Sequence, residues 1–219
     1  MLNLYVSAFV LLVLVGCANE ATGPTNPEAP AQEASVPNAV LSRELDPVVV
    51  SQMELSGAQP KGSSQKLFDA ALVAFAAQDF SKAESLLVEV TTKQPELSGP
   101  WVNLGQVYIQ RNQIEAAGTA YRKAIEVNAN NCAAYTQLGV LSRQAGDFES
   151  AEQYYTSCLK RIPGYKDALL NLGILYDLYL GRLSEALLAY QRYQELEAEP
   201  SRRIAGWVVD LERRIRSQS

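Results

Sequence analysis

Residues 103–108, NLGQVY, hold a leucine–glycine pair inside what their pattern predicts to be an amphipathic helix. The pair Leu104-Gly105 returns as Leu138-Gly139 in QLGVLS and as Leu172-Gly173 in NLGILY, each time after 34 residues. Glycine costs a helix interior about 1 kcal/mol relative to alanine. Three helices that accept glycine at one fixed position therefore indicate a repeated unit in which the glycine has a packing role.

The 34-residue period divides the middle of the chain into four units, at residues 64–97, 98–131, 132–165 and 166–199. Corresponding places in the units hold similar residues. The second unit has Trp101 at place four, Ala117 at place twenty and Tyr121 at place twenty-four. The fourth unit slips by one residue within LYLGRL, residues 178–183, and then recovers with Ala186 and Tyr190.

This pattern resembles the tetratricopeptide repeat, in which each unit is a pair of antiparallel helices. The resemblance covers about two thirds of the chain and implies an all-α fold, a right-handed helical-repeat superhelix. We expect the small residue at place eight to face the small residue at place twenty, as Gly105 would face Ala117, so that the two helices approach closely. The large aromatic residues are then expected to be core residues and not a ligand cage: Trp101, Tyr121, Tyr155 and Tyr190.

The last 20 residues, 200–219, predict one more helix. Its apolar residues form a single stripe with arginines opposite: Ile204, Trp207, Val208, Leu211 and Ile215. A helical-repeat array needs a cap over its last apolar surface. We therefore interpret this helix as a C-terminal capping helix.

The composition narrows the class of protein. The chain is 47% hydrophobic and 20% charged, with a net charge of −5 and no Lys/Arg cluster that forms a basic stripe, which argues against a nucleic-acid surface. It contains no histidine, the commonest metal ligand and general base, and its three cysteines form no CxxC motif. We therefore predict neither a metal nor another cofactor.

The N-terminal region predicts a membrane anchor. Residues 1–16 form a short apolar run that suits a signal peptide, and residues 14–17, LVGC, resemble the lipobox of bacterial lipoproteins. The resemblance implies cleavage before Cys17 and acylation of that residue. Since Ala18 follows it in place of an aspartate retention signal, the periplasmic face of the outer membrane is favoured over the inner membrane. No Lys or Arg precedes the apolar run, so an uncleaved anchor or a misplaced gene start is the alternative.

Residues 17–63 are rich in Pro, Ala, Glu, Ser and Thr, and we interpret them as a lipidated flexible tether. Residues 48–55 within it are unusually apolar, with three valines, Met53 and Leu55. Two interpretations stay open. The segment is either a short extended stretch docked on the repeats or an internal peptide that occupies the binding groove until it is displaced.

Two cysteines of the third unit are candidates for a disulfide. Cys132 opens the first helix and Cys158 lies near the end of the second, so antiparallel packing brings both to the same edge. The periplasm favours disulfides. The alternative is a pair of small buried residues.

The resemblance also implies a groove lined by the first helices of the units. Mapped onto this sequence, its partner-binding residues are Phe68, Leu72, Phe75, Val102, Asn103, Gln106, Ile109, Gln137, Val140, Arg143, Asn171, Ile174 and Asp177. Apolar groups mixed with amides suit a peptide or a partner helix. The Lys, Asn and Arg clamp by which chaperone-binding members hold a terminal carboxylate is absent, because its places hold Phe68, Leu72, Val102, Gln106, Thr136 and Val140.

These features predict a non-catalytic, membrane-tethered adaptor of the bacterial cell envelope. It would bind another envelope protein in the assembly of a pilus or secretion apparatus, an energy-transducing complex or the wall-synthesis machinery. One alternative is a self-assembling structural lipoprotein. Another is an enzyme or small-ligand binder, but Asp167 and Asp177 lie ten residues apart and no histidine could activate Ser142.

Overall fold

The computed structural model describes residues 60–199 and 201–218. The expected signal peptide, Cys17 and the tether up to residue 59 lie outside these residues. The described helices are α2 (Ser63–Ala76), α3 (Phe80–Lys93), α4 (Ser98–Gln110), α5 (Ile114–Val127), α6 (Cys132–Gln144), α7 (Phe148–Arg161), α8 (Lys166–Ile174), the π-helical turn η2 (Leu175–Tyr179), α9 (Leu183–Glu195) and α10 (Arg202–Gln218). Within the described part of the chain, none of them has both the length and the apolar character to cross a membrane.

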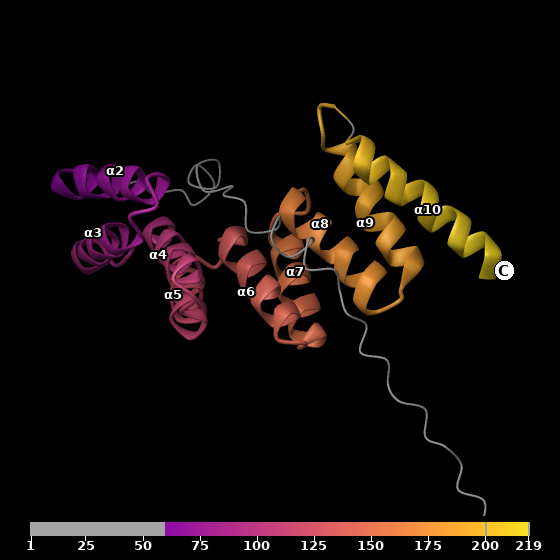
Figure 1. The fold of residues 1–219 in the computed structure, drawn as a ribbon, viewed down its shortest axis with the longest axis horizontal. Coiled ribbons are helices and arrows are strands. Elements are labelled where there is room, and N and C mark those ends of the chain that lie inside the picture. The colour runs from indigo at the N-terminus through magenta and orange to yellow at the C-terminus, as the bar shows by residue number, and fades with distance from the viewer. Residues whose placement is uncertain (1–59, 200, 219) are drawn as a thin grey trace, which may run out of the picture. The chain divides into compact units, whose positions relative to one another are not determined.

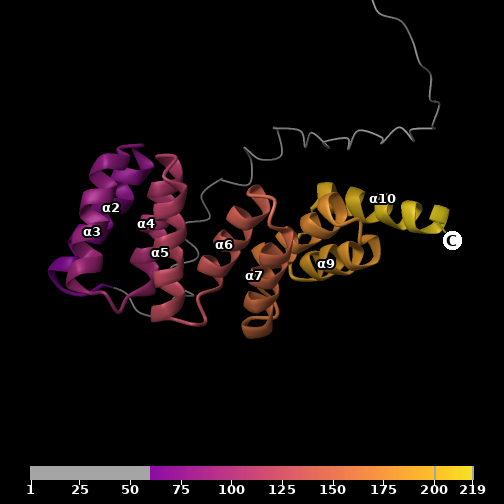
Figure 2. The ribbon, with the colours of Figure 1, turned by 90° about the horizontal axis from the view of Figure 1, so that it is seen from below.

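The helices pack as consecutive pairs, α2 with α3, α4 with α5, α6 with α7, and α8 with α9 (Figure 1). Figure 2 shows the same succession from a second direction. The first helices of the pairs begin at Ser63, Ser98, Cys132 and Lys166, beside the expected unit starts. The all-α helical-repeat solenoid expected from the sequence is therefore confirmed.

The turn inside each pair repeats as regularly as the helices. It contains one residue in the left-handed region, with φ between 57° and 80°: Gln78, Asn112, Gly146 and Gly181. Two of the second helices then begin at an aspartate. Asp79 accepts a hydrogen bond from the backbone N–H of Lys82 at 3.1 Å, and Asp147 accepts one from Ser150 at 3.0 Å.

The repeated glycines lie under the repeated tyrosines. A Cβ added at Gly105, Gly139 or Gly173 would come within 3.0 Å of the ring of Tyr121, Tyr155 or Tyr190, respectively. The nearest atoms to the glycine belong to the aromatic residue at place twenty-four, and the expected facing of the glycine and the small residue at place twenty stays a prediction. Ala117 and its counterparts are fully buried beside the contact. The glycine leaves room for a flat ring on the helix backbone.

The one-residue slip of the fourth unit appears as the π-helical turn η2. The backbone N–H of Leu180 donates to the carbonyl of Leu175 at 3.1 Å, five residues back, where an α-helix would bond four residues back. The left-handed residue Gly181 consequently follows Gly146 by 35 residues. Because the extra residue lies beyond Gly173, it does not disturb the contact of that glycine with Tyr190.

Helix α10 packs on α9 at the C-terminal end of the array. Its residues Ile204 and Leu211 are buried, and the ring of Trp207 lies 5.3 Å from the ring of Tyr190, measured between centroids. The helix thus covers the apolar surface of the last pair, as a cap does.

Candidate partner-binding face

The predicted groove residues all lie on the first helices of the pairs, and we call the surface formed by α2, α4, α6, α8 and η2 the first-helix face. Seven of them are half-buried and keep part of their side chain accessible: Leu72, Phe75, Gln106, Ile109, Gln137, Asn171 and Asp177. The other six are buried: Phe68, Val102, Asn103, Val140, Arg143 and Ile174. The binding role of all thirteen stays a prediction.

Four of the buried residues have a packing role. Phe68 belongs to the core of the first pair, Val102 to the core between the second and third pairs, and Val140 and Ile174 to the core of the C-terminal half. Their apolar side chains join neighbouring units, which is how a solenoid gains its stability. Residues of this kind position a binding surface and are not themselves available to a partner in this structure.

Arg143 is the buried cation of the face, with 2% of its surface exposed. It donates to the hydroxyl of Tyr179 at 3.3 Å and to Oδ1 of Asn171 at 3.4 Å. Its guanidinium also lies 5.5 Å from the centre of the Tyr179 ring. A cation close to an aromatic face is attracted by the ring quadrupole. Arg143 therefore links α6 to α8 and η2 across the first-helix face.

Asp177 is engaged by the capping helix. Arg214 of α10 donates to Oδ1 of Asp177 at 2.6 Å, and only 10% of the aspartate side chain is exposed. The arginines of α10 were expected opposite its apolar stripe, so the inward reach of Arg214 corrects that expectation for this residue. One of the predicted groove residues thus holds the capping helix in place.

The predicted aromatic core residues divide into two kinds. Tyr121, Tyr155 and Tyr190 are buried, with 0 to 1% exposed, which confirms them as core. Burial raises the pKa of Tyr121 far above its usual value. Trp101 is half-buried, packs against the first two cores, and donates its indole N–H to the carbonyl of Pro95 at 3.0 Å.

The structure joins Cys132 to Cys158 in a disulfide. Their Cα atoms lie 4.8 Å apart, inside the usual range of about 4.4–6.8 Å. The bond links the start of α6 to the last turns of α7, the edge at which the sequence placed both residues. Of the two interpretations left open there, the structure has the bridged one.

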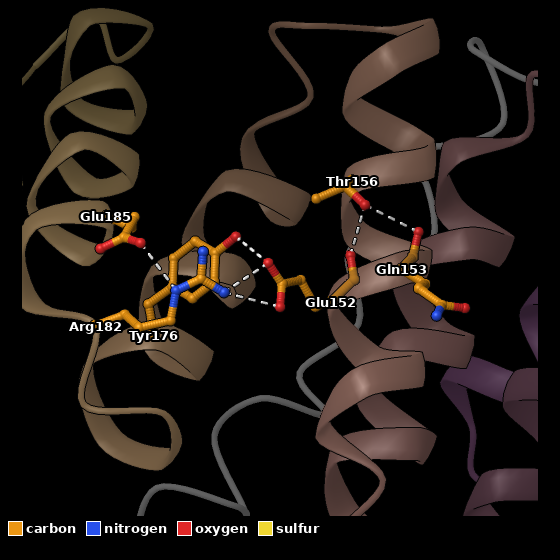
Figure 3. Close-up of polar contacts among 6 residues, drawn as sticks. All are labelled: Glu152, Gln153, Thr156, Tyr176, Arg182 and Glu185. Carbon is orange, nitrogen blue, oxygen red and sulfur yellow. Dashed lines mark hydrogen bonds and ion pairs between the residues drawn. The ribbon is translucent and has the colours of Figure 1, made fainter.

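A polar cluster between the third and fourth pairs was not expected from the sequence (Figure 3). Arg182 donates to both oxygens of Glu152, at 2.8 and 3.0 Å, and Tyr176 donates its hydroxyl proton to the same carboxylate at 2.7 Å. Arg182 also donates to Glu185 at 2.9 Å and lies 4.3 Å from the centre of the Tyr176 ring. The cluster joins α7 to η2 and α9.

This cluster shifts the pKa values of its side chains, among them those of Tyr176 and Glu185. Burial, followed by the bond to Glu152, raises the pKa of Tyr176 to about 12. The hydrogen bond from Arg182 lowers the pKa of Glu185. Both pKa shifts keep Tyr176 protonated and Glu185 ionised at neutral pH, which are the forms that make these hydrogen bonds. The cluster therefore stabilises the packing of neighbouring units. Since Glu152 and Arg182 lie 30 residues apart, no local sequence pattern could predict their contact.

The acidic residues considered for a catalytic or metal site do not form a cluster. Asp177 is paired with Arg214, and in the described part of the chain no three His, Cys, Asp or Glu side chains are grouped as they would be around a metal ion.

Comparisons with known proteins agree with the repeat geometry. A family model described as TPR repeat matches residues 105–146, and one described as tetratricopeptide repeat matches residues 136–201. The curated protein CTR9 homolog of Arabidopsis thaliana is 30% identical over 101 residues, which are 44% of this chain but 9% of that protein. This chain therefore matches only a small fraction of that relative's length.

Solved structures show the same fold. That of pilF from Pseudomonas aeruginosa has a TM-score of 0.62 at 17% identity and covers 70% of this chain and 69% of its own. That of MamA from Desulfovibrio magneticus has a TM-score of 0.58 at 17% identity and covers 71% of this chain and 87% of its own.

Proposed function

We propose that this chain is a non-catalytic adaptor whose first-helix face binds a peptide or helix of another protein, because models of the tetratricopeptide repeat, a fold of protein–protein interaction modules, match residues 105–201. We further propose that acyl chains on Cys17 hold it at a bacterial membrane, on the periplasmic face of the outer membrane. Its role there is the assembly of an envelope complex.

The observation that carries the adaptor role is the chemistry of the half-buried residues on the face. Leu72, Phe75 and Ile109 offer apolar surface, while Gln106 and Gln137 offer amides that can hydrogen-bond a peptide backbone. They lie on three successive first helices. A surface of this kind suits a partner segment that runs across several units.

The support for the anchor comes from the sequence. The apolar run of residues 1–16 is shorter than the about 20 residues of a spanning helix and ends directly before Cys17. Stable membrane attachment takes more than one acyl chain, which acylation of both the thiol and a new amino terminus would supply.

The adaptor role is tested by purifying the tagged, full-length protein from crosslinked envelopes. Ile109→Asp puts a charge on the half-buried surface of α4, and Val88→Asp puts the same charge on α3, where Val88 is 42% exposed. We expect a partner that is recovered with the wild type and with Val88→Asp but lost with Ile109→Asp. Recovery with both variants, or with neither, contradicts binding on the first-helix face.

The anchor is tested by metabolic labelling with palmitate. We expect the wild type to incorporate label and to pellet with membranes, and Cys17→Ser to do neither. Unlabelled wild-type protein, or label that persists in the variant, contradicts acylation at this residue.

A further inference from the structure

Asn103 lies near the middle of α4, and its side-chain nitrogen is buried. The residue is 5% exposed, and Nδ2 has no hydrogen-bond acceptor among the described residues. An unmade hydrogen bond of a buried amide is costly, so such groups usually have a partner. An acceptor from elsewhere is therefore expected beside Asn103.

Around Asn103, the first two turns of α4 and the first turn of α6 have no side widely open to solvent. Of residues 98–105 in α4 all but Trp101 are buried, and residues 132–136 of α6 are buried without exception. Eight successive residues make about two turns and five make more than one, so these stretches sample every direction around each helix. In α2, by contrast, Lys66, Asp69 and Val73 leave one side exposed. The first-helix face is therefore covered at the N-terminal parts of α4 and α6, whereas Gln106, Ile109 and Gln137 further along these helices stay partly accessible.

The chain that precedes the repeats arrives next to this covered region. Pro60 is buried. The backbone N–H of Lys61 donates to Oε1 of Gln94 at 3.3 Å, and Nε2 of Gln94 donates to the carbonyl of Lys61 at 3.4 Å. Gln94 caps the C-terminus of α3, four residues before α4 begins. Residues before Lys61 therefore start from the N-terminal end of α4.

The sequence supplies an occupant within reach. Val48, Val49, Val50, Met53 and Leu55 lie 6 to 13 residues before Lys61. An extended chain advances about 3.3 Å per residue, so these residues can lie roughly 20 to 43 Å from Lys61. Neighbouring packed helices are about 10 Å apart. The segment is therefore long enough to cross both α4 and α6.

We propose that residues 48–55 bind in extended form across α4 and α6 on the first-helix face of the same molecule. The valines, Met53 and Leu55 supply the apolar cover, and a backbone carbonyl of the segment accepts the hydrogen bond of Asn103 Nδ2. Since the adaptor role proposed above uses the same face, the segment is an internal competitor there. A partner binds only after it has displaced the segment, and this competition lowers the apparent affinity of the partner for the face.

The test uses the full-length protein alone, with photoreactive methionine. The chain has two methionines, Met1 and Met53, so a crosslink lost in Met53→Leu originates from the segment. After reduction, trypsin yields peptides 94–111 and 124–143, which hold α4 and nearly all of α6 together with residues 124–127 of α5. Peptides 112–122 and 144–160 hold most of the second helices α5 and α7. A mixture of isotope-labelled and unlabelled copies separates crosslinks within a molecule from those between molecules.

We expect Met53 to crosslink within one molecule to peptides 94–111 and 124–143. The yield should fall several-fold in Val49→Asp, which lies outside the repeats, and in Asn103→Ala. It should be unchanged in Gln110→Ala, a matched amide change at the exposed end of α4.

Crosslinks that fall mainly in peptides 112–122 and 144–160, that join two molecules, that are absent, or that persist in Val49→Asp overturn the proposal. Since no partner is present, the result stands apart from the adaptor role. If these crosslinks are found but the test of the adaptor role fails, the segment binds the repeats as part of the fold and competes with no partner.

Discussion

The contact between repeated glycines and tyrosines predicts that Gly139→Ala destabilises the protein although alanine is the better helix former. The substitution gains about 1 kcal/mol of helix propensity. The added Cβ, however, comes within 3.0 Å of the ring of Tyr155, which is fully buried and packed in the C-terminal core. Forcing an extra methyl group into a filled core costs up to about 3 kcal/mol. The expected net loss is about 2 kcal/mol in the free energy of unfolding.

Gly118 is the matched control on α5. A Cβ there meets only the guanidinium of Arg122, at 3.3 Å and at the end of an exposed, flexible side chain. Gly118→Ala should therefore keep the propensity gain of about 1 kcal/mol. Urea unfolding followed by far-ultraviolet circular dichroism measures both variants, and the predicted gap between them is about 3 kcal/mol.

A double variant separates the steric cause from other effects. In Gly139→Ala/Tyr155→Leu the smaller side chain makes room for the new methyl group, so the loss should be smaller than the sum of the two single losses. If Gly139→Ala is as stable as Gly118→Ala, or if the two losses at Gly139 and Tyr155 simply add, the ring does not require the glycine and the packing argument is refuted.

Three further predictions follow from the turn, the disulfide and the polar cluster. Gln78→Gly should stabilise the protein by about 1 kcal/mol, because φ at this position is 61°, whereas Gly146→Gln, at 80°, should destabilise it in the same unfolding assay. Reducing the disulfide between Cys132 and Cys158, which are 26 residues apart, should cost about 3.5 kcal/mol of stability by the chain-entropy relation; equal stability with and without reductant would contradict it. Because the pKa of Tyr176 is raised to about 12, the folded state keeps a proton that the unfolded chain loses near pH 10, so stability should fall between pH 10 and 12. Tyr176→Phe should make that fall shallower in unfolding curves recorded across this range, and an unchanged slope would count against the assignment.

The repeat architecture could be predicted from the sequence because the apolar pattern of a helix depends on residues close together in the chain. The apolar stripe of α10 depends on residues three or four positions apart, and the 34-residue period, with its alanines and tyrosines in register, is found by comparing the sequence with itself. The one-residue slip was visible for the same reason, and the structure shows it as η2. What the period could not reveal was that Gln78 and Asn112 occupy the left-handed turn position held by glycine in the later pairs.

The candidate site was harder to predict because exposure depends on what covers a residue. Asn103 and Arg143 occupy places that were expected to line an open groove, yet both are at least 95% buried. Arg214 was expected to face solvent and instead binds Asp177. The partners of Arg143 and Arg214 lie 28 and 37 residues away, so a pattern of spacing along one helix could not predict these contacts.

The disulfide also sets how the protein yields to force. If the chain were pulled from its two ends, residues 133–157 between Cys132 and Cys158 would bear no tension even after every helix had unfolded. At up to about 3.6 Å per residue, that is roughly 90 Å of contour that only a reductant can release. The length of a fully stretched molecule would therefore depend on the redox state of its surroundings. Unfolding alone gives the shorter length, and reduction of the disulfide adds the rest.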